Sequence, residues 1–266
     1  MSGQLTFFRK SYCDYERTYV TATASEGTGA LSVLDRSNRT LWGTSGSVDA
    51  NNTTLTIDMV DTVTIDTILL IKHNFKNFKI QYWDLVGLVW ANFSLAINPT
   101  TSTDSTSYFT FTPVQTTKLV LTIYGTQVVD ADKVLCQFIA TAKIAQLNGW
   151  PVLKKPLLSR NLQERPMLSG KRHILQNIGF YSVSLSVKNW SDATDLTTVE
   201  TLYSSSEGFL FWPCGSNQTQ FRSVRQGYRL EDIYLVRCKN ELTPEFVDGL
   251  YQAGLNLQID LIEVIT

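Results

Sequence analysis

Cysteine and histidine are the side chains best suited to nucleophilic attack and metal binding, and this 266-residue sequence has four of the first and two of the second. The most suggestive is Cys214, which follows the apolar run GFLFWP at residues 208–213. A reactive cysteine needs a nearby base and an electropositive setting. Neither His73 nor His173 lies in a protease-like motif, and the proline and glycine on either side of Cys214 favour a turn. We therefore interpret Cys214 as a structural residue that follows a buried strand.

The other candidates for catalysis lack a recognisable arrangement. No two cysteines form a CxxC pair, and two histidines do not provide zinc-ligand spacing. The carboxylates are scattered along the chain, and a glycosidase pair stays open because sequence does not show their separation in space. The sequence has no phosphate-binding loop, dinucleotide fingerprint or serine elbow. We predict that the protein is not an enzyme and has no cofactor.

Aromatic side chains are the other residues that could form a binding site. Trp42, Trp83, Trp90 and Tyr82 could stack on the apolar faces of sugar rings, or they could fill a hydrophobic core. The core is the commoner place for any one aromatic residue, and we predict it for Trp42. Trp90, in the run GLVW, stays a candidate for carbohydrate binding.

Charge and hydropathy exclude several classes of partner. The net charge of −1 and the pI of about 6.1 give no bulk attraction to nucleic acid or to an anionic membrane. The one basic cluster, within residues 154–172, is interrupted by prolines and a glycine, which indicates a solvated connection. No stretch approaches the ~18 apolar residues of a membrane span, and the N-terminus lacks the apolar core of a signal peptide. We expect a protein made in a cytoplasm that binds neither nucleic acid nor membrane.

Short apolar runs separated by turn residues dominate residues 30–145 and indicate β-strands. The segment LTIDM at residues 55–59 alternates as a half-buried strand does, and TILLI at residues 67–71 is a continuous apolar run. After the turn residues HNFKN at 73–77, the segment FKIQYW at 78–83 alternates again. The regular spacing of such strands predicts an antiparallel sandwich.

Four residues within 146–172 break any regular element and indicate the approach to a second domain, namely Pro151, Pro156, Pro166 and Gly170. That domain has expected strands near residues 180–188, 207–213, 219–227, 231–238 and 255–264, and one helix capped at Ser191 and Asp192. The predicted fold class is mainly β. It combines an N-terminal jelly-roll β-sandwich at residues 1–147 with a C-terminal small β-barrel or sandwich, with one packed α-helix, at residues 148–266.

The series LSVLDRSNRTLWGTSGS, TLTIDM and TVTIDTILLIKHNFKNFKIQYW at residues 31–83 places an Asp-containing loop before a Trp strand and an alternating strand. In this order it resembles the discoidin-like (galactose-binding-like) jelly-roll domains, over residues 5–145. Many such domains bind carbohydrate or calcium through these loops, and others are adhesive or structural. The resemblance implies Asp35, Arg36 and Arg39 as candidate carbohydrate-binding residues beside Trp90, and it leaves calcium open.

Residues 180–264 contain FYSVSLSV, then an expected helix, then GFLFWPCG, and finally the closing strand LQIDLIEV. Their order and spacing resemble the distal tail protein superfamily of long-tailed bacteriophages, in particular the lambdoid minor tail protein M type. The resemblance implies a virion structural protein that forms a homo-oligomeric ring, most commonly hexameric, at the distal end of the tail. Its partners would be the tail tube protein and the hub or tip proteins. We name Arg160, Arg165, Tyr228 and Arg229 as candidate ring contacts.

The sequence thus supports a main prediction and an alternative. The main prediction is the tail ring protein, with the β-sandwich domain directed outward. The alternative is a carbohydrate-binding adhesion module that recognises a glycan of the host surface. A ring former should assemble irrespective of sugar, whereas a lectin should lose glycan binding when Trp90 or Asp35 is replaced.

Overall fold

The computed structural model describes most of the first half of the chain and separate segments of the second half. The chain forms two compact units, which we call the inserted unit (Arg9–Lys143) and the host unit (Met1–Phe8 with Ile144–Thr266). Both are built mainly from antiparallel β-strands, which confirms the predicted fold class. The described residues are 5–14, 16–17, 19–37, 39–147, 152–153, 157–159, 162–166, 172–176, 180–190, 193–204, 208–213, 231–239, 245–247 and 254–264.

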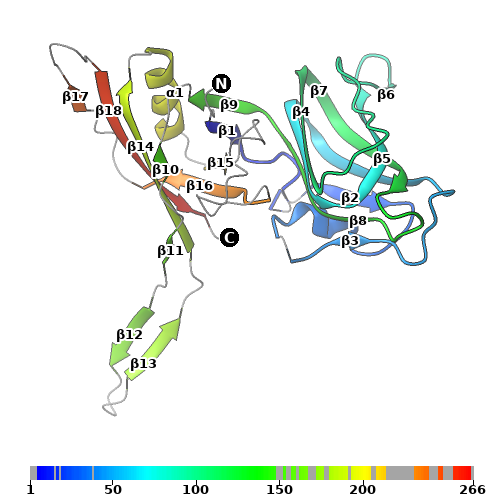
Figure 1. Ribbon diagram of the computed structural model, residues 1–266, viewed down its shortest axis with the longest axis horizontal. Coiled ribbons are helices and arrows are strands. Elements are labelled where there is room, and N and C mark those ends of the chain that lie inside the picture. Colours follow the sequence, from blue (N-terminus) through cyan, green and yellow to red (C-terminus); the bar gives the residue numbers. More distant parts are fainter. Residues whose placement is uncertain are drawn as a thin grey trace. The chain divides into compact units, whose positions relative to one another are not determined.

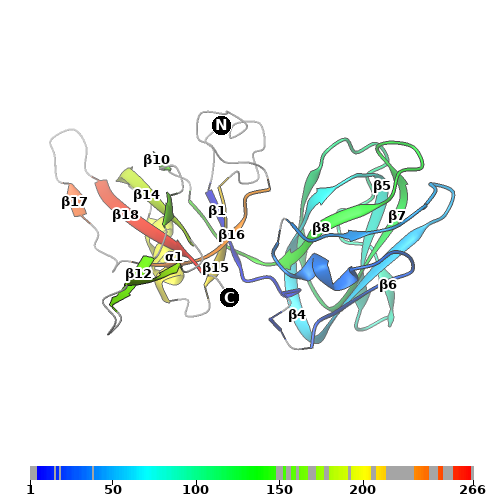
Figure 2. The same cartoon turned by 90° about the horizontal axis from the view of Figure 1, so that it is seen from below.

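Within the part of the inserted unit that the structure describes, there are seven strands and a 3-10 helix. Figures 1 and 2 show how they are arranged. The strand order is β3-β8-β4-β7-β5-β6, and β2 pairs with β4. The elements are β2 (Thr21–Ala24), η1 (Ala30–Leu34), β3 (Trp42–Gly43), β4 (Thr53–His73), β5 (Phe75–Asp84), β6 (Val89–Ala91), β7 (Thr106–Thr126) and β8 (Val134–Thr141).

The two long strands β4 and β7 take part in both layers of the sandwich. The first part of β4, residues 53–58, pairs with residues 118–123 of β7 and with β2. The later part of β4 pairs with residues 106–116 of β7 and with β8. The register shifts between Asp58 and Val63, where Val60 has a φ of 62°. Such an irregularity bends a strand and increases its twist, so β4 and β7 turn from one layer into the other.

The alternation in the sequence decides which side chains fill the space between the layers. Leu55, Ile57 and Met59 are buried in one core cluster, while the residues between them face outward. Trp42 is fully buried in the same cluster, and its indole nitrogen donates to the Glu26 carbonyl oxygen at 3.1 Å. The prediction that Trp42 is a core residue is therefore confirmed.

The described strands of the host unit include one large sheet in the order β10-β14-β18-β16-β15-β1-β9, with β11 paired to β14 and β17 to β18. The helix α1 (Ala193–Ser204) buries Val199 and Leu202, as the expected helical spacing requires. The strands are β1 (Leu5–Arg9), β9 (Lys143–Leu147), β10 (Val152–Leu153), β11 (Leu157–Ser159), β14 (Phe180–Trp190), β15 (Phe209–Trp212), β16 (Tyr234–Cys238), β17 (Glu245–Val247) and β18 (Gly254–Glu263).

The inserted unit interrupts the host unit between two neighbouring strands. Strand β1 leads into it and β9 follows it, and these two strands are adjacent in the host sheet. Phe7 of β1 is fully buried and packs against Phe209 and Phe211 of β15, with ring centroids 5.6 and 5.5 Å apart. The sequence placed the first eight residues with residues 9–147, but in the structure Met1–Phe8 group with the later part of the chain.

The run GFLFWP forms the buried strand that we expected. All four side chains of β15 are buried, at 0–2% exposure. Cys214 and the expected strand at residues 219–227 lie outside the described residues. Among the residues that the structure describes, no helix is long and apolar enough to cross a membrane.

Candidate functional site

Asp35, one of the residues predicted to bind sugar, organises its own turn. It follows η1, and its two carboxylate oxygens accept hydrogen bonds from the Ser37 amide at 2.8 Å and from the Thr40 hydroxyl at 2.6 Å. Arg39 is exposed on the same turn, where its backbone amide donates to the Ser37 hydroxyl at 3.1 Å. The Asp35 carboxylate thus holds the loop closed on itself.

Arg36 is engaged in a network of ion pairs. Its guanidinium Nε lies 3.2 Å from Asp14 Oδ2, and its Nη2 lies 3.0 Å from Glu16 Oε1. Lys10 completes the group by pairing with Glu16. Asp14 is buried, so Arg36 compensates its charge and ties the loop after η1 to the segment before β2.

Trp90, the fourth predicted residue, lies on a different part of the inserted unit. It belongs to β6, which ends the strand order on one side. The helix η1, which precedes Asp35, packs against β2, β3 and β8 instead. The structure therefore brings Asp35, Arg36 and Arg39 into one loop and places Trp90 on a separate strand.

Trp90 forms a cross-strand pair with Trp83 of β5. The two residues are directly opposite in the antiparallel register, and their rings meet edge to face with centroids 5.3 Å apart at 78°. The Trp90 side chain is 37% exposed. Because side chains alternate along a strand, Gln81 and Asn92 lie on this same face. Their amides are joined by a hydrogen bond from Gln81 Nε2 to Asn92 Oδ1 of 3.2 Å.

The turn between β5 and β6 is fixed by Asp84. Its carboxylate accepts hydrogen bonds from the amides of Val86 and Gly87, both at 3.1 Å, and its carbonyl oxygen accepts one from Leu88 at 2.9 Å. Leu88 has a φ of 52°, which is in the left-handed region. This bonded turn sets the register of the hairpin and so places Trp90 opposite Trp83.

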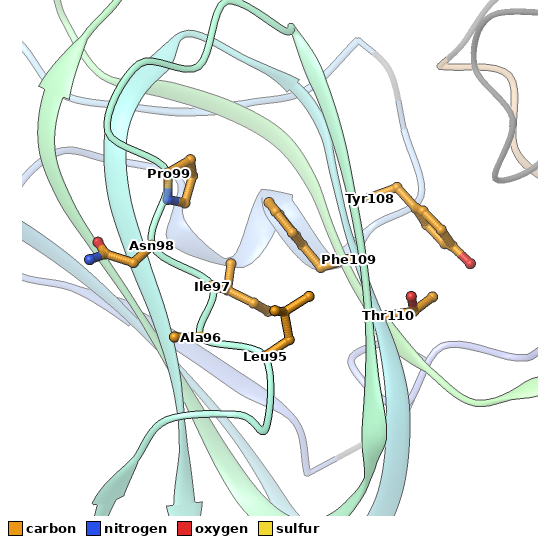
Figure 3. Close-up of a pocket in the computed structure, with 8 residues that line it drawn as sticks. All are labelled: Leu95, Ala96, Ile97, Asn98, Pro99, Tyr108, Phe109 and Thr110. Carbon is orange, nitrogen blue, oxygen red and sulfur yellow. The ribbon is translucent and has the colours of Figure 1, made fainter.

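An apolar pocket of 430 Å³ follows the hairpin (Figure 3). The side chains of Leu95, Ile97 and Phe109 point toward one another in it, and Tyr108 points to the other side of its strand. Ile97 accepts a hydrogen bond from the Ile80 amide at 3.0 Å, so the segment runs along the edge of β5. The lining residues, which carry no charge, are Leu95, Ala96, Ile97, Asn98, Pro99, Tyr108, Phe109 and Thr110.

The pocket and the tryptophan pair are close along the chain. Leu95 is three positions after Asn92, and three residues span at most about 10 Å. Phe93, which lies between them, is buried against Tyr82 and Phe111 on the inner face, with centroids 5.1 and 4.0 Å away. Along this segment Trp90, Asn92 and Leu95 are therefore exposed, whereas Phe93 faces the core.

His73 and Ser107 form a buried pair that resembles part of a catalytic dyad but has the wrong hydrogen bonding. Nε2 of His73 lies 2.8 Å from the Ser107 hydroxyl oxygen. The Phe75 amide donates to Nδ1 at 3.1 Å, so Nδ1 is an acceptor and the proton of the neutral ring must lie on Nε2. Burial lowers the pKa of His73 to about 4. The ring therefore donates to Ser107 and does not accept its proton.

The three cysteines in the described residues have no feature of a nucleophile. Burial raises the pKa of Cys13 and of Cys238 to about 12, and it also raises the pKa of Cys136. A thiol with so high a pKa stays protonated at neutral pH. Within the described part of the chain, no three His, Cys, Asp or Glu side chains are grouped to hold a metal ion.

The structure describes one of the four candidate ring contacts. Arg165 lies on β12 (Leu162–Pro166), which pairs with β13 (Arg172–Gln176). Arg160, Tyr228 and Arg229 lie outside the described residues.

Both tryptophans were predicted from the sequence as candidate sugar-binding residues, but the two amide side chains beside them were not. The alternation of FKIQYW places Gln81 and Trp83 on one face of the strand, so the position of these two residues could be predicted from the sequence. The position of Asn92 opposite Gln81 depends on the hairpin register, which the Asp84 turn determines. That turn has no Asn-Gly or Asp-Gly pair to mark it in the sequence.

Comparison with known proteins gives likenesses of structure at low sequence identity. No protein-family model matches the chain, and no curated protein sequence matches it. The chain is similar to chitosan-binding module 1 of a chitosanase/glucanase from Paenibacillus sp. IK-5, with 17% identity and a TM-score of 0.41, over 50% of this chain and 98% of that chain.

Two further similar structures come from Clostridium perfringens. One is the family 32 carbohydrate-binding module of NanJ in complex with galactose, at 16% identity and a TM-score of 0.40, over 52% of this chain and 98% of that chain. The other is CpGH89CBM32-5 in complex with GalNAc-β-1,3-galactose, at 13% identity and a TM-score of 0.40, over 47% of this chain and 97% of that chain.

Proposed function

We propose that the inserted unit is a carbohydrate-binding domain, which is the alternative that the sequence left open. The observation that carries this proposal is the exposed face made by the Trp83–Trp90 pair and the Gln81–Asn92 amide pair. A sugar ring offers an apolar face of C–H groups and a rim of hydroxyls. An indole complements the first, and planar amides donate to and accept from the second.

The arrangement supports binding because the side chains of the site are already held in place before a ligand binds. Trp83 holds the Trp90 ring edge to face, and Asp84 fixes the turn that connects them. A preorganised contact loses less conformational entropy on binding than a mobile one. All four side chains of the site are uncharged, so the proposed ligand is a neutral glycan. The 430 Å³ pocket beyond Asn92 offers room for a neighbouring substituent of that glycan.

Replacing Trp90 with alanine tests the proposal. Once a glycan array of the full-length protein has identified a ligand, we expect Trp90→Ala to weaken its binding about 30-fold in calorimetry, since loss of a central tryptophan costs about 2 kcal/mol. The matched control is Tyr19→Ala, which removes an aromatic residue that is 69% exposed just before β2, on the edge away from β6. Equal affinities for the Trp90 variant and the wild type, or no glycan bound by the wild type, would refute the proposal.

A second candidate function is the predicted virion role, in which the host unit forms a ring at the distal end of a phage tail. The hairpin β12–β13 favours it. These strands pair only with each other among the described strands, over residues 162–166 and 172–176. An isolated two-stranded hairpin is marginally stable in water, so a neighbouring subunit that covers it would explain its presence. The inserted unit is then an added binding domain on a structural ring.

The ring proposal has its own test. We expect the full-length protein to elute as a closed oligomer, with six subunits as the expected number, and to appear as rings in electron micrographs whether or not glycan is present. Replacing residues 160–178 with a short Gly-Ser linker should shift the protein toward monomers, because it removes the proposed inter-subunit hairpin. A wild-type protein that stays monomeric at high concentration and is absent from tails would rule out this role and leave the glycan proposal standing.

A further inference from the structure

Lys133 is an unusual lysine because its side chain is completely buried. It lies one residue before β8 in the inserted unit and has an exposure of 0%. Lysine almost never lies wholly inside a protein unless its charge is compensated, since desolvating an ammonium group is costly. The environment of Lys133 therefore needs an explanation.

The ammonium group of Lys133 has one oxygen acceptor for each of its three N–H groups. Nζ lies 2.7 Å from the Ser47 hydroxyl oxygen, 2.9 Å from the Asn51 carbonyl oxygen and 3.3 Å from the Val48 carbonyl oxygen. An ammonium group has three hydrogen-bond donors and no acceptor, so all of its hydrogen-bonding groups have a partner. All three oxygens belong to the loop that connects β3 to β4.

The backbone of Lys133 holds the start of the same loop. Its amide donates to the Thr44 hydroxyl at 2.8 Å, and its carbonyl oxygen accepts from the Thr44 amide at 3.0 Å. The preceding residue, Asp132, accepts a hydrogen bond from the Ser47 amide at 3.2 Å. The loop of residues 44–52 is therefore wrapped around one side chain.

Compensation of the positive charge comes through Ser47. While its oxygen accepts from Lys133, its hydroxyl hydrogen is directed to Glu26 Oε2, 3.5 Å away. The same carboxylate oxygen accepts from the Thr53 hydroxyl at 3.2 Å. The Lys133 ammonium, the Ser47 hydroxyl and the Glu26 carboxylate thus form a chain in which each hydrogen bond polarises the next.

We propose that the Lys133 ammonium acts as a built-in cation that orders the β3–β4 loop in place of a metal ion. Backbone carbonyl and hydroxyl oxygens around a point charge are the kind of ligand that hard cations such as calcium prefer. The N–O distances of 2.7–3.3 Å suit an ammonium group, and they are longer than the roughly 2.3–2.6 Å of calcium–oxygen bonds. The calcium that the sequence left open does not fit here, because the protein's own charge fills the site and repels it.

The predicted consequence is a loop whose order does not depend on calcium but does depend on the ammonium group. In the full-length protein, Lys133→Ala should lower the melting temperature of the inserted unit by about 10 °C, because it leaves the loop carbonyls buried without a donor. Alanine keeps Cβ, so the missing piece is n-propylammonium. This ion in the buffer should recover part of the lost melting temperature, and uncharged 1-propanol should not.

Matched measurements make the outcome decisive. Lys118→Ala removes a lysine that is 43% exposed and 2.6 Å from Asp58, and it should give a small shift that n-propylammonium does not reverse. If Lys133→Ala does not fold, Ser47→Ala gives the milder test, because it removes one of the three acceptors and should lower the melting temperature by a few degrees. Calcium and EDTA should leave the wild type unchanged. A wild-type melting temperature that rises with calcium, or a Lys133→Ala protein that 1-propanol restores as well as n-propylammonium does, would overturn the proposal.

Discussion

Replacing Phe7 with alanine is expected to destabilise the host unit strongly while the stability of the inserted unit stays unchanged. Phe7 is fully buried against Phe209 and Phe211, with ring centroids 5.6 and 5.5 Å away. Truncating a core phenylalanine costs about 3–5 kcal/mol, which is a large share of the 5–15 kcal/mol that stabilises a typical domain. The expected effect falls on residues about 200 positions later in the chain, because β1 is a strand of the host sheet.

Hydrogen exchange resolved by peptide is the measurement that separates the two units. In Phe7→Ala, amides of β15 and β16 should exchange faster than in the wild type, and those of β4 and β7 should keep their protection. The matched control is Phe138→Ala, because Phe138 is buried in the core cluster of the inserted unit. It should give the reverse pattern. Loss of protection in β4 and β7 of the Phe7 variant would place the first strand with the inserted unit and refute the insertion.

The insertion itself could not be predicted from the sequence, although most single strands could. Alternation within LTIDM or FKIQYW is local, and it marked the inner faces of β4 and β5. The pairing of β1 with strands beyond residue 143 is a contact between distant parts of the chain, and no local pattern encodes it. A boundary near residue 147 followed from composition, which changes where the closely spaced Pro151, Pro156 and Pro166 begin.

The segment HNFKN shows how burial overrides turn chemistry. The sequence predicted five turn residues there, but β4 continues to His73 and β5 begins at Phe75. This interpretation was wrong, because His73 and Phe75 are both buried with their rings stacked 5.0 Å apart. Asn74 alone makes the connection, and its side-chain amide donates to the Asp132 carbonyl oxygen at 2.7 Å.

The candidate site was predictable only as far as its residue types. Exposed aromatic residues on a β-sandwich suggested sugar binding, which led to Trp90. Whether Trp90 meets Trp83 or Asp35 depends on strand register and order, and these place it with Trp83. Lys133 gave no signal at all, because a lone lysine in a polar segment usually reaches solvent. Its role comes from the path of the β3–β4 loop around it.

Acidification should destabilise the inserted unit through His73. Burial lowers the pKa of its imidazole from the ordinary 6.5 to about 4, so below pH 6.5 the unfolded chain takes up a proton that the folded unit does not. The stability contributed by the neutral ring is fully present above pH 6.5 and is lost as the pH falls toward 4. At about 1.4 kcal/mol per pH unit, the full loss is about 3 kcal/mol.

Chemical denaturation of the full-length protein between pH 7.5 and pH 4 tests this expectation, with exchange protection of β4 reporting on the inserted unit. Carboxylates also titrate in this range, so the quantity to compare is the slope of the wild type minus that of His73→Asn. The Asn variant should be less stable at pH 7.5 but should have the shallower slope. Ser107→Ala is the matched control: it removes the hydrogen-bond partner of His73 and leaves the ring buried, so the slope should persist. An imidazole that titrates near pH 6.5 by NMR in the folded protein would contradict the burial argument, because the folded and unfolded states would then bind protons alike.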